Sequence, residues 1–376
     1  MIYYVGYYMD YEYLHQVKAA VSAVSKMNYI ATLLKVIDSV SIVSRSYSIV
    51  NKQMKARELK IDDSLNLINF KSYRSLGRIT RNLNRLYVNK QLESFCLKNI
   101  KSTDVVVIYH STDDLKLIEL LKQKIGCKIV LEVEEIYADV TNDKDLKLRE
   151  LKAFENCDGF IISVEELYQA LEIEKPYIVI NGTYEPEPIR EVSFNDTKIH
   201  CIYAGTFDQT KGGALAAVKA AEFLPKEYHV HILGFGTEKQ VENIKNEINK
   251  VQNKVNCILT YDGLKSGDEY IEFLQKCHIG LCTQIPDAKY VQTSFPSKIL
   301  VYLANGLRVL SVYIPAIANS KVGNLLYYYN DQNPQVIAQA IRNIDISKPY
   351  NSRNELITID NLAKNEIKEL IRNVKK

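Results

Sequence analysis

The chain has 376 residues, a formal net charge of +3 at pH 7 and 47% hydrophobic residues. This length exceeds one typical domain and suits two, with enough apolar sequence to form both cores. The small net charge excludes binding of nucleic acid through an overall basic field, so any basic surface must be local.

The seven cysteines lie singly along the chain, without a CxxC pair. This spacing indicates neither a zinc site nor a disulfide framework, so we expect most cysteines to be small buried residues in a reducing compartment. No apolar run approaches the ~20 residues that span a bilayer, and the N-terminus lacks a basic region followed by an apolar core. The sequence therefore predicts a cytoplasmic protein.

The first strand is predicted at Ile2–Gly6, a short apolar run that ends at a glycine. This opening is typical of nucleotide-type α/β domains, whose ligands gather at the carboxyl ends of parallel strands. A helix is expected within residues 14–34, and a second strand at Val40–Ser44. Gly6 is therefore a candidate residue of a ligand site.

A basic amphipathic helix is predicted within residues 71–90, and no acidic residue occurs between Asp63 and Glu93. Four arginines at spacings of four, three and four share one face: Arg74, Arg78, Arg81 and Arg85. A second stripe is apolar: Leu76, Ile79, Leu83 and Leu86. Such a helix can lie on an anionic membrane, but the same pattern fits the solvated face of an ordinary packed helix.

Two more buried strands are predicted at Val105–Tyr109 and Lys128–Glu132, with a helix between them and polar groups at their carboxyl ends. Carboxylates at such strand ends can orient a hydroxylated substrate or stabilise a developing positive charge. They can equally be helix N-caps and solvated acids, and a lone histidine is as ambiguous. The candidates are His110, Glu132, Glu134 and Glu135, with alternation placing Glu135 on the face opposite the other two glutamates.

The first domain is predicted to end with strands at Asp158–Ser163 and Tyr177–Gly182, before a proline-bearing polar linker at residues 184–198. The strand pattern then restarts, which predicts two Rossmann-like domains in tandem. The later strands are expected at Ile199–Gly205, His229–Gly236, Val255–Gly263 and Ile279–Cys282. His229 and His231 alternate on one of them, but no third ligand is in view, so no metal site is predicted.

A loop that becomes a helix is predicted at residues 293–306, with Pro296 in the first helical turn and a glycine just past the end. The start of such a helix presents unpaired N–H groups at the positive end of its dipole. The hydroxyls of Ser294 and Ser297 and the ammonium of Lys298 stand beside it. The stretch predicts an anion site, although an ordinary helix start with a solvated lysine has the same pattern.

Six motifs follow one another in the chain: Asn181–Gly182; Tyr203–Gly205 with Lys211 and Gly212; Ile232–Gly236; Tyr261–Gly263; Cys277–Leu281; and Ser294–Leu300 with Tyr302–Gly306. In order and spacing they resemble glycosyltransferases of the GT-B fold and, within them, the retaining family four. The resemblance is strongest in residues 199–310 and weaker before them. It implies an α/β fold of two Rossmann-like domains facing across a cleft, with a C-terminal helix crossing back to the first domain. The domains are expected at residues 1–190 (acceptor), 191–350 (nucleotide sugar) and 351–376 (helix).

The resemblance also implies site residues. The expected donor-binding residues are Gly205, Thr206, Lys211, Gly234, Gly236, Tyr261, Thr293, Ser294, Phe295, Pro296, Ser297 and Lys298. The acceptor side is expected at Gly6, His110, Glu134 and Glu135, and the catalytic groups at Glu134, Lys298 and Lys211. The chain departs from the family pattern where an arginine is replaced by Thr206, and where two glutamates eight positions apart are replaced by Thr293 and Val301.

The leading hypothesis is a metal-independent, cofactor-free glycosyltransferase that moves a hexosyl-type sugar from a nucleotide diphosphate sugar to a glycan or lipid-linked acceptor. We expect a UDP-type donor and retention of the configuration at the anomeric carbon. We also expect a role in bacterial surface polysaccharide synthesis, with the protein lying peripherally on the inner face of the membrane. No nucleic-acid partner is expected. Two alternatives remain open: a catalytically degenerate GT-B partner protein and a nucleotide-sugar 2-epimerase.

Overall fold

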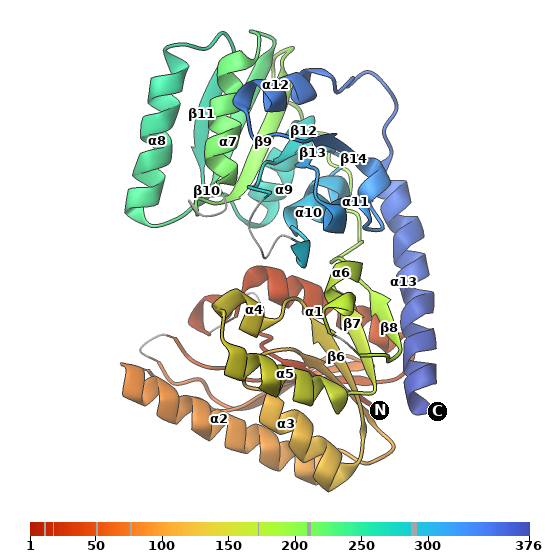
Figure 1. Cartoon of the computed structure of the whole chain (residues 1–376). Helices are drawn as coiled ribbons and strands as arrows, with labels where there is room; N and C mark the ends of the chain where they lie inside the picture. The colour runs from red at the N-terminus through yellow and green to blue at the C-terminus, as the bar shows by residue number, and fades with distance from the viewer. Residues whose placement is uncertain are drawn as a thin grey trace. The chain divides into compact units, whose positions relative to one another are not determined.

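The computed structural model describes residues 1–10, 13–17, 19–49, 52–75, 77–171, 173–208, 212–286 and 292–376. It divides into two compact units. Unit 1 comprises Met1–Thr183 together with Leu362–Lys376, and unit 2 comprises Tyr184–Asn361. Each unit contains one largely parallel sheet with helices packed on it (Figure 1).

Unit 1 contains an eight-stranded sheet in the order β3-β4-β2-β1-β5-β6-β7-β8. The strands are β1 Ile2–Gly6, β2 Val40–Ser44, β3 Arg57–Asp62, β4 Leu65–Asn69, β5 Val105–Tyr109, β6 Lys128–Val133, β7 Gly159–Ile162 and β8 Tyr177–Val179. The central strands are apolar runs buried on both faces, as a parallel sheet requires. β3 alone runs antiparallel to its neighbour. The β3–β4 hairpin is not among the elements predicted from the sequence.

The helices of unit 1 are α1 Val21–Lys35, α2 Arg78–Asn99, α3 Leu115–Leu120, α4 Tyr137–Thr141, α5 Lys144–Glu155 and α6 Glu165–Gln169. The helix expected within residues 14–34 is α1, which begins at Val21 after a short 3₁₀ turn at Leu14–Gln16. The helical position predicted for Arg74 was wrong. The basic helix begins at Arg78, after the extended Gly77, so Arg74 lies outside it.

The C-terminal helix α13, Ser352–Lys375, contributes its second half to unit 1. It lies so close to β7 that a Cβ atom at Gly159 would stand 2.8 Å from a methyl carbon of Val374 and 3.1 Å from one of Leu370. A side chain at Gly159 would therefore push the helix away from the strand.

Unit 2 contains a six-stranded parallel sheet in the order β11-β10-β9-β12-β13-β14. The strands are β9 Ile199–Thr206, β10 Tyr228–Phe235, β11 Ile258–Gly263, β12 Ile279–Cys282, β13 Arg308–Val312 and β14 Leu326–Tyr329. The chain runs outward from β9 to β11 and then returns to the other side of β9 as β12. Because ligands of such sheets bind where the strand order reverses, the carboxyl ends of β9 and β12 mark the expected ligand site of unit 2.

The helices of unit 2 are α7 Gly213–Ala220, α8 Glu238–Gln252, α9 Gly267–Lys276, α10 Lys298–Ala304, α11 Pro315–Ala318 and α12 Pro334–Arg342. α7 packs against α8 and α12 and contacts β9 and β10. α10 contacts β12 and β13. The right-handed crossovers of a parallel sheet place α9 and α10 on the face opposite α7 and α8.

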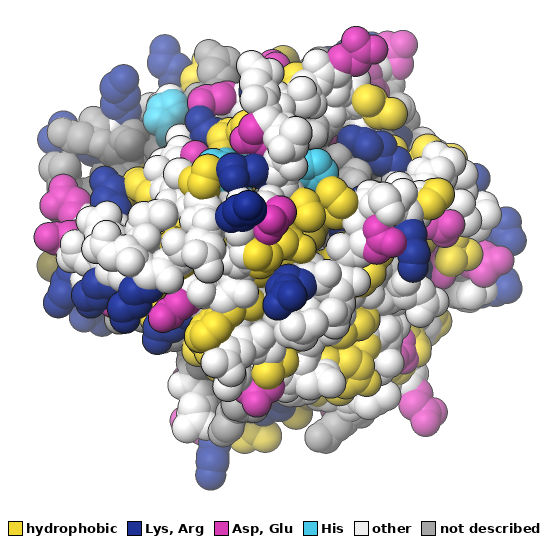
Figure 2. All heavy atoms as spheres, turned by 90° about the horizontal axis from the view of Figure 1, so that it is seen from above, with side chains coloured by type: hydrophobic (Ala, Val, Ile, Leu, Met, Phe, Trp, Pro, Cys, Tyr) yellow, Lys and Arg dark blue, Asp and Glu magenta, His cyan; other side chains and the backbone are white. Residues whose placement is uncertain are grey.

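All seven cysteines are free and buried, which confirms their predicted role as small core residues. On the face shown in Figure 2, basic and acidic side chains occur together with hydrophobic side chains between them. Within the described ranges, every helix is too short or too polar to cross a membrane.

Candidate functional site

The predicted anion-binding stretch enters its helix later than the sequence suggests. α10 begins at Lys298, with Ser297 as the preceding cap residue. Pro296 therefore lies before the helix, and its carbonyl accepts a hydrogen bond from the Ile299 N–H at 3.0 Å. The helix ends as predicted, with Gly306 just past it in the left-handed conformation at φ +84°. α10 has only seven residues, so the charge available to an anion comes mainly from the lysine.

The ammonium of Lys298 stands at the carboxyl end of β9. Its Nζ lies 3.9 Å from the ring centroid of Tyr203, and a Cβ atom at Gly205 would be 3.0 Å from it. Among the residues that the structure describes, no carboxylate forms an ion pair with Lys298. The ring holds the cation electrostatically without neutralising it, so the full charge remains available to an anionic ligand.

Glycines allow the backbone to approach closely at this point. Gly234 has φ +151°, and a Cβ atom there would stand 1.8 Å from the carbonyl oxygen of Gly205. A Cβ atom at Gly213, the first residue of α7, would stand 2.8 Å from Tyr203 Cε2. The hydroxyl of Tyr203 donates to the carbonyl of Thr206 at 3.1 Å. Larger residues at these glycines would displace either the strand ends or the ring beneath Lys298.

Tyr302 fixes α10 to the sheet. The backbone N–H of Ala204 donates to the Tyr302 hydroxyl at 2.8 Å, and the side chain is fully buried. A Cβ atom at Gly280 on β12 would be 2.4 Å from the Tyr302 ring, so only glycine fits beneath it. Because α10 is tied to β9 in this way, Lys298 is held beside Gly205.

The other predicted donor residues are distributed around the same strand ends. Tyr261 on β11 is half-buried, with its ring centroid 6.0 Å from that of Phe207 and the ammonium of Lys245 5.0 Å from its own centroid. Thr206 and Gly236 are exposed, Thr293, Ser294, Phe295 and Pro296 are half-buried, and Ser297 is exposed. Lys211 lies outside the described residues.

In unit 1, Glu134 lies just past the end of β6 and forms an ion pair with Lys26 of α1, whose side chain is only 7% exposed. Glu132 is fully buried on β6 and accepts a hydrogen bond from the Tyr4 hydroxyl. Burial raises the pKa of Glu132 to about 7; Lys26 opposes that shift and Glu134 adds to it. The sequence predicts a site residue at Glu134 but not at Lys26, because nothing in the pattern of α1 distinguishes this lysine from a surface residue.

The other predicted acceptor-side residues have partners of their own. His110 is buried, and its Nε2 lies 2.7 Å from Oε1 of Glu150. The Glu150 carboxylate also accepts the N–H groups of Tyr137 and Ala138, which begin α4. Gly6 packs against α1, since a Cβ atom there would stand 2.5 Å from Met27 Cε. Glu135 is half-buried in the loop between β6 and α4.

A buried polar network, whose pairs the sequence does not predict, lies at the carboxyl ends of β1, β2 and β5. Arg45 forms an ion pair with Asp114 at 2.5 Å between Nη2 and Oδ1, and both side chains are almost completely buried. The hydroxyls of Tyr7 and Tyr47 donate to Oδ2 of Asp113 at 2.8 and 3.3 Å. The strand order of unit 1 reverses between β1 and β5, so the network occupies the expected ligand position of this sheet. The position of these residues just after predicted strands is the signal that could have identified them.

The surface of α2 combines charge with exposed apolar side chains. Its buried residues are Asn84, Val88, Leu92 and Cys96. By contrast, Ile79, Leu83 and Leu86 are exposed by 77%, 61% and 59%. Arg78 and Arg81 are also exposed, whereas Arg85 forms an ion pair with Asp113 at 3.1 Å. Leu76, the first residue of the predicted apolar stripe, lies outside the described residues, and the other three do not belong to the face that packs on unit 1.

The structure also places a third histidine, His200 on β9, beside the two histidines of β10. Burial lowers the pKa of His229 to about 4, with further lowering by His231 and His200. The sequence could not reveal this third member, because it becomes a neighbour only through the pairing of β9 with β10.

No family model matches the chain, and no curated protein matches it. Solved structures do match. The apo structure of OtsA superposes with a TM-score of 0.72 at 12% identity, covering 100% of this chain and 99% of that one. The trehalose-6-phosphate structure from E. coli bound with UDP-2-fluoro glucose gives a TM-score of 0.70 at 12% identity, with 100% and 99% covered.

A UDP-forming alpha,alpha-trehalose-phosphate synthase from Burkholderia xenovorans, in complex with glucose-6-phosphate, gives a TM-score of 0.70 at 9% identity, with 100% of both chains covered. The likeness thus extends over both Rossmann-like units and the C-terminal helix. The chain has the GT-B fold, as its sequence predicts.

Proposed function

We propose that the chain is a glycosyltransferase that moves a sugar from a nucleotide diphosphate sugar to a glycan or lipid-linked acceptor in bacterial surface polysaccharide or glycoconjugate synthesis. The observation that carries this proposal is the ammonium of Lys298. It stands over Tyr203 and beside Gly205 at the carboxyl end of the central strand of unit 2. A fixed cation beside a side-chain-free backbone suits the diphosphate of such a donor.

A UDP-type donor is favoured. Two of the similar structures support this choice, since one is bound with UDP-2-fluoro glucose and the other is described as UDP-forming. The six sequence motifs, which resemble retaining family four, support a retaining outcome. The helix start Phe295–Lys298 resembles that of a subset of transferases that build bacterial surface polysaccharides, which supports this role.

In the proposed reaction, the bond between the anomeric carbon and the diphosphate oxygen breaks while the acceptor oxygen bonds to the same carbon. Lys298, with Lys211, neutralises the negative charge that develops on the departing diphosphate, and Ser297 donates a hydrogen bond to it. The proton of the acceptor hydroxyl passes to the leaving phosphate on the same face of the sugar. Glu134, held by Lys26, orients a sugar hydroxyl and does not act as a nucleophile.

Calorimetry and thermal shift with UDP, GDP and their common sugar conjugates test the proposal. We expect UDP and at least one UDP-sugar to bind and to raise the melting temperature, in EDTA as well as without it, because lysines supply the positive charge. Mass spectrometry of the products with a candidate glycan acceptor then checks for sugar transfer.

The alternatives give different results in the same assays. Binding of a nucleotide sugar without turnover of any donor would favour a degenerate GT-B partner protein. Conversion of the nucleotide sugar without an acceptor would favour a 2-epimerase. Failure of every nucleotide to bind would contradict the donor site at Lys298.

We further propose that α2 lies on an anionic membrane surface, which would bring the enzyme to a lipid-linked acceptor. Its exposed apolar residues Ile79 and Leu83 stand among Arg78 and Arg81, and α2 carries no acidic residue before Glu93. Apolar side chains can enter the interface while each arginine contributes ~1 kcal/mol of attraction to anionic lipid.

Leu83→Asp is therefore expected to reduce binding to phosphatidylglycerol-containing vesicles at least tenfold, because it places a carboxylate in the apolar stripe. Co-sedimentation at low salt measures this change. Leu148→Asp is the matched control, since Leu148 on α5 is 70% exposed and lies outside α2. If the wild type does not bind these vesicles, or if both variants bind as it does, α2 is an ordinary solvated helix.

A further inference from the structure

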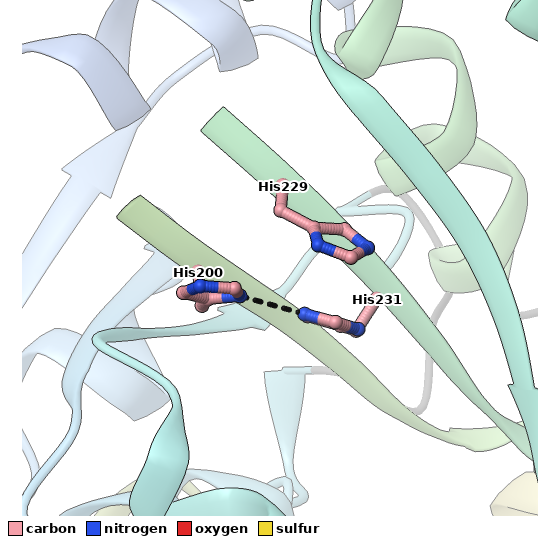
Figure 3. Close-up of side chains that lie close together, drawn as sticks. All are labelled: His200, His229 and His231. Carbon is pink, nitrogen blue, oxygen red and sulfur yellow. Dashed lines mark hydrogen bonds between the residues drawn. The ribbon is translucent and has the colours of Figure 1, made fainter. Parts of the chain in front are cut away.

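Three histidines gather at the amino end of the unit 2 sheet, on one face. His200 is the second residue of β9 and pairs in register with His229, the second residue of β10. His231 lies two residues further along β10 and so faces the same side. One nitrogen of each ring lies within 4.8 Å of the others. Figure 3 shows His200 and His231 facing each other, with His229 beside them.

Each ring is held from outside by a hydrogen bond to an oxygen atom. His200 Nε2 lies 2.9 Å from Oδ1 of Asp196, and His231 Nδ1 lies 3.1 Å from Oδ2 of Asp262. His229 Nε2 lies 3.0 Å from Oγ1 of Thr260. The threonine hydroxyl donates its proton to Asp262 at 2.7 Å, so it accepts from His229.

These hydrogen bonds to Asp196, Asp262 and Thr260 determine which ring nitrogens remain free to bind a metal ion. Carboxylates accept hydrogen bonds, so His200 Nε2 and His231 Nδ1 carry protons, as does His229 Nε2. The inner nitrogens are therefore Nδ1 of His200, Nε2 of His231 and Nδ1 of His229. Two of them, on His200 and His231, lie 2.9 Å apart and point at each other.

We propose that His200, His229 and His231 bind a divalent transition-metal ion such as Zn²⁺ through these inner nitrogens. Imidazole nitrogens are common zinc ligands, and metal-binding histidines almost always donate their other N–H to a carboxylate or another oxygen acceptor. Asp196, Asp262 and Thr260 supply that outer set.

Two of the three ligands need only a small adjustment, whereas the ring of His229, which stacks on that of His231 with centroids 3.8 Å apart, must turn so that its inner nitrogen meets the same ion. Two nitrogens bound to one tetrahedral zinc ion at ~2.0–2.1 Å are about 3.4 Å apart. The inner nitrogens of His200 and His231 must therefore separate by roughly half an ångström to bind one ion. Water fills the fourth position, because the protein supplies three ligands.

Aromatic side chains enclose the three rings. Phe194 stacks on His200 and His231, with ring centroids 4.0 and 5.0 Å apart, and Phe273 of α9 meets His231 edge-on at 5.1 Å. An apolar surrounding limits access of water and strengthens the bonds between metal and ligands.

The metal site is separate from the proposed donor site. His200 and Gly205 are five residues apart on β9, which corresponds to roughly 16 Å along a strand. Phe194 and Asp196 belong to the segment that precedes β9, so the metal would fasten this segment to β9 and β10. Its role is therefore to stabilise unit 2 and not to take part in sugar transfer.

Zinc binding by the full chain tests the proposal. The protein is stripped with a chelator and titrated with ZnCl₂ in a calorimeter. We expect one Zn²⁺ per chain, and a melting temperature that rises with Zn²⁺. Titration with Co²⁺ in place of Zn²⁺ should give the intense visible absorption of a four-coordinate site. This measurement uses the wild-type protein alone.

Three substitutions remove an inner nitrogen but keep an outer donor: His229→Gln, His200→Gln and His231→Asn. His229→Gln is the first choice, because His229 is only half-buried and glutamine can still reach Thr260. We expect it to weaken zinc binding at least 100-fold and to abolish the rise in melting temperature. His15→Gln, at an exposed histidine of unit 1, is the matched control and should bind as the wild type does.

Two results would overturn the proposal: wild-type protein that binds no zinc at micromolar concentration, or equal binding by wild type and by a folded His229→Gln variant. The circular dichroism spectrum of each variant shows whether it is folded. UDP binding in EDTA is measured in parallel, so that failure of the metal site and failure of the donor site remain distinguishable.

Discussion

Lys298→Met is expected to lower kcat/KM for the donor by about 10²–10³-fold, which corresponds to roughly 2.7–4 kcal/mol of transition-state stabilisation. The ammonium of Lys298 carries no ion pair among the described residues and stands beside Gly205, so its whole charge can act on the departing diphosphate. Methionine keeps the length of the side chain and its contact with Tyr203 but removes the charge. Initial rates with the nucleotide sugar selected by the binding screen measure the change.

Two further variants make this result specific. Lys298→Arg keeps the charge and should retain more activity than Lys298→Met, although the different shape of the guanidinium lowers it below the wild type. Lys254→Met removes an exposed lysine elsewhere in unit 2 and should have no effect. Equal UDP affinity and equal kcat/KM in Lys298→Met and wild type would remove Lys298 from the site.

Arg45→Met is expected to destabilise unit 1 by about 3–5 kcal/mol, because it leaves the carboxylate of Asp114 buried without its counter-ion. Both side chains are almost completely buried, and the pair is joined at 2.5 Å. Burial raises the pKa of Asp114, and Arg45 opposes that shift. Urea unfolding followed by circular dichroism measures the loss, which corresponds to a melting temperature lower by about 10 °C.

A second substitution tests the cause of this loss. Arg45→Met combined with Asp114→Asn removes both charges and should recover at least half of the lost stability. Arg85→Met breaks the more exposed pair with Asp113 and should cost less than ~1 kcal/mol. If Arg45→Met is as stable as the wild type, water reaches Asp114 and the pair is not a stabilising element.

The confirmed predictions concern segments whose residue types are dictated by their local environment. β1, β2 and β5 are apolar runs because a central parallel strand is covered on both faces, and they lie where the sequence predicts. The β3–β4 hairpin was missed because β3 is an exposed edge strand with polar residues, which the apolar criterion cannot detect. Within the predicted stretch 14–34, α1 begins only at Val21, because Leu14–Gln16 form a 3₁₀ turn and Ala20 is extended.

The same distinction applies to the candidate sites. The sequence by itself determined the order along the chain of the strands, of the glycines at their ends and of Lys298. Strand ends and close backbone approaches demand particular residues at those positions. Only the tertiary structure decided the partners: Lys26 with Glu134, Arg45 with Asp114, and His200 with His229 and His231. These pairs are separated by 29 residues or more, except for the two histidines of β10. In unit 1 the partners meet because the sheet orders its strands differently from the chain, and in unit 2 the histidines meet because β9 and β10 pair in parallel register; residue spacing records neither.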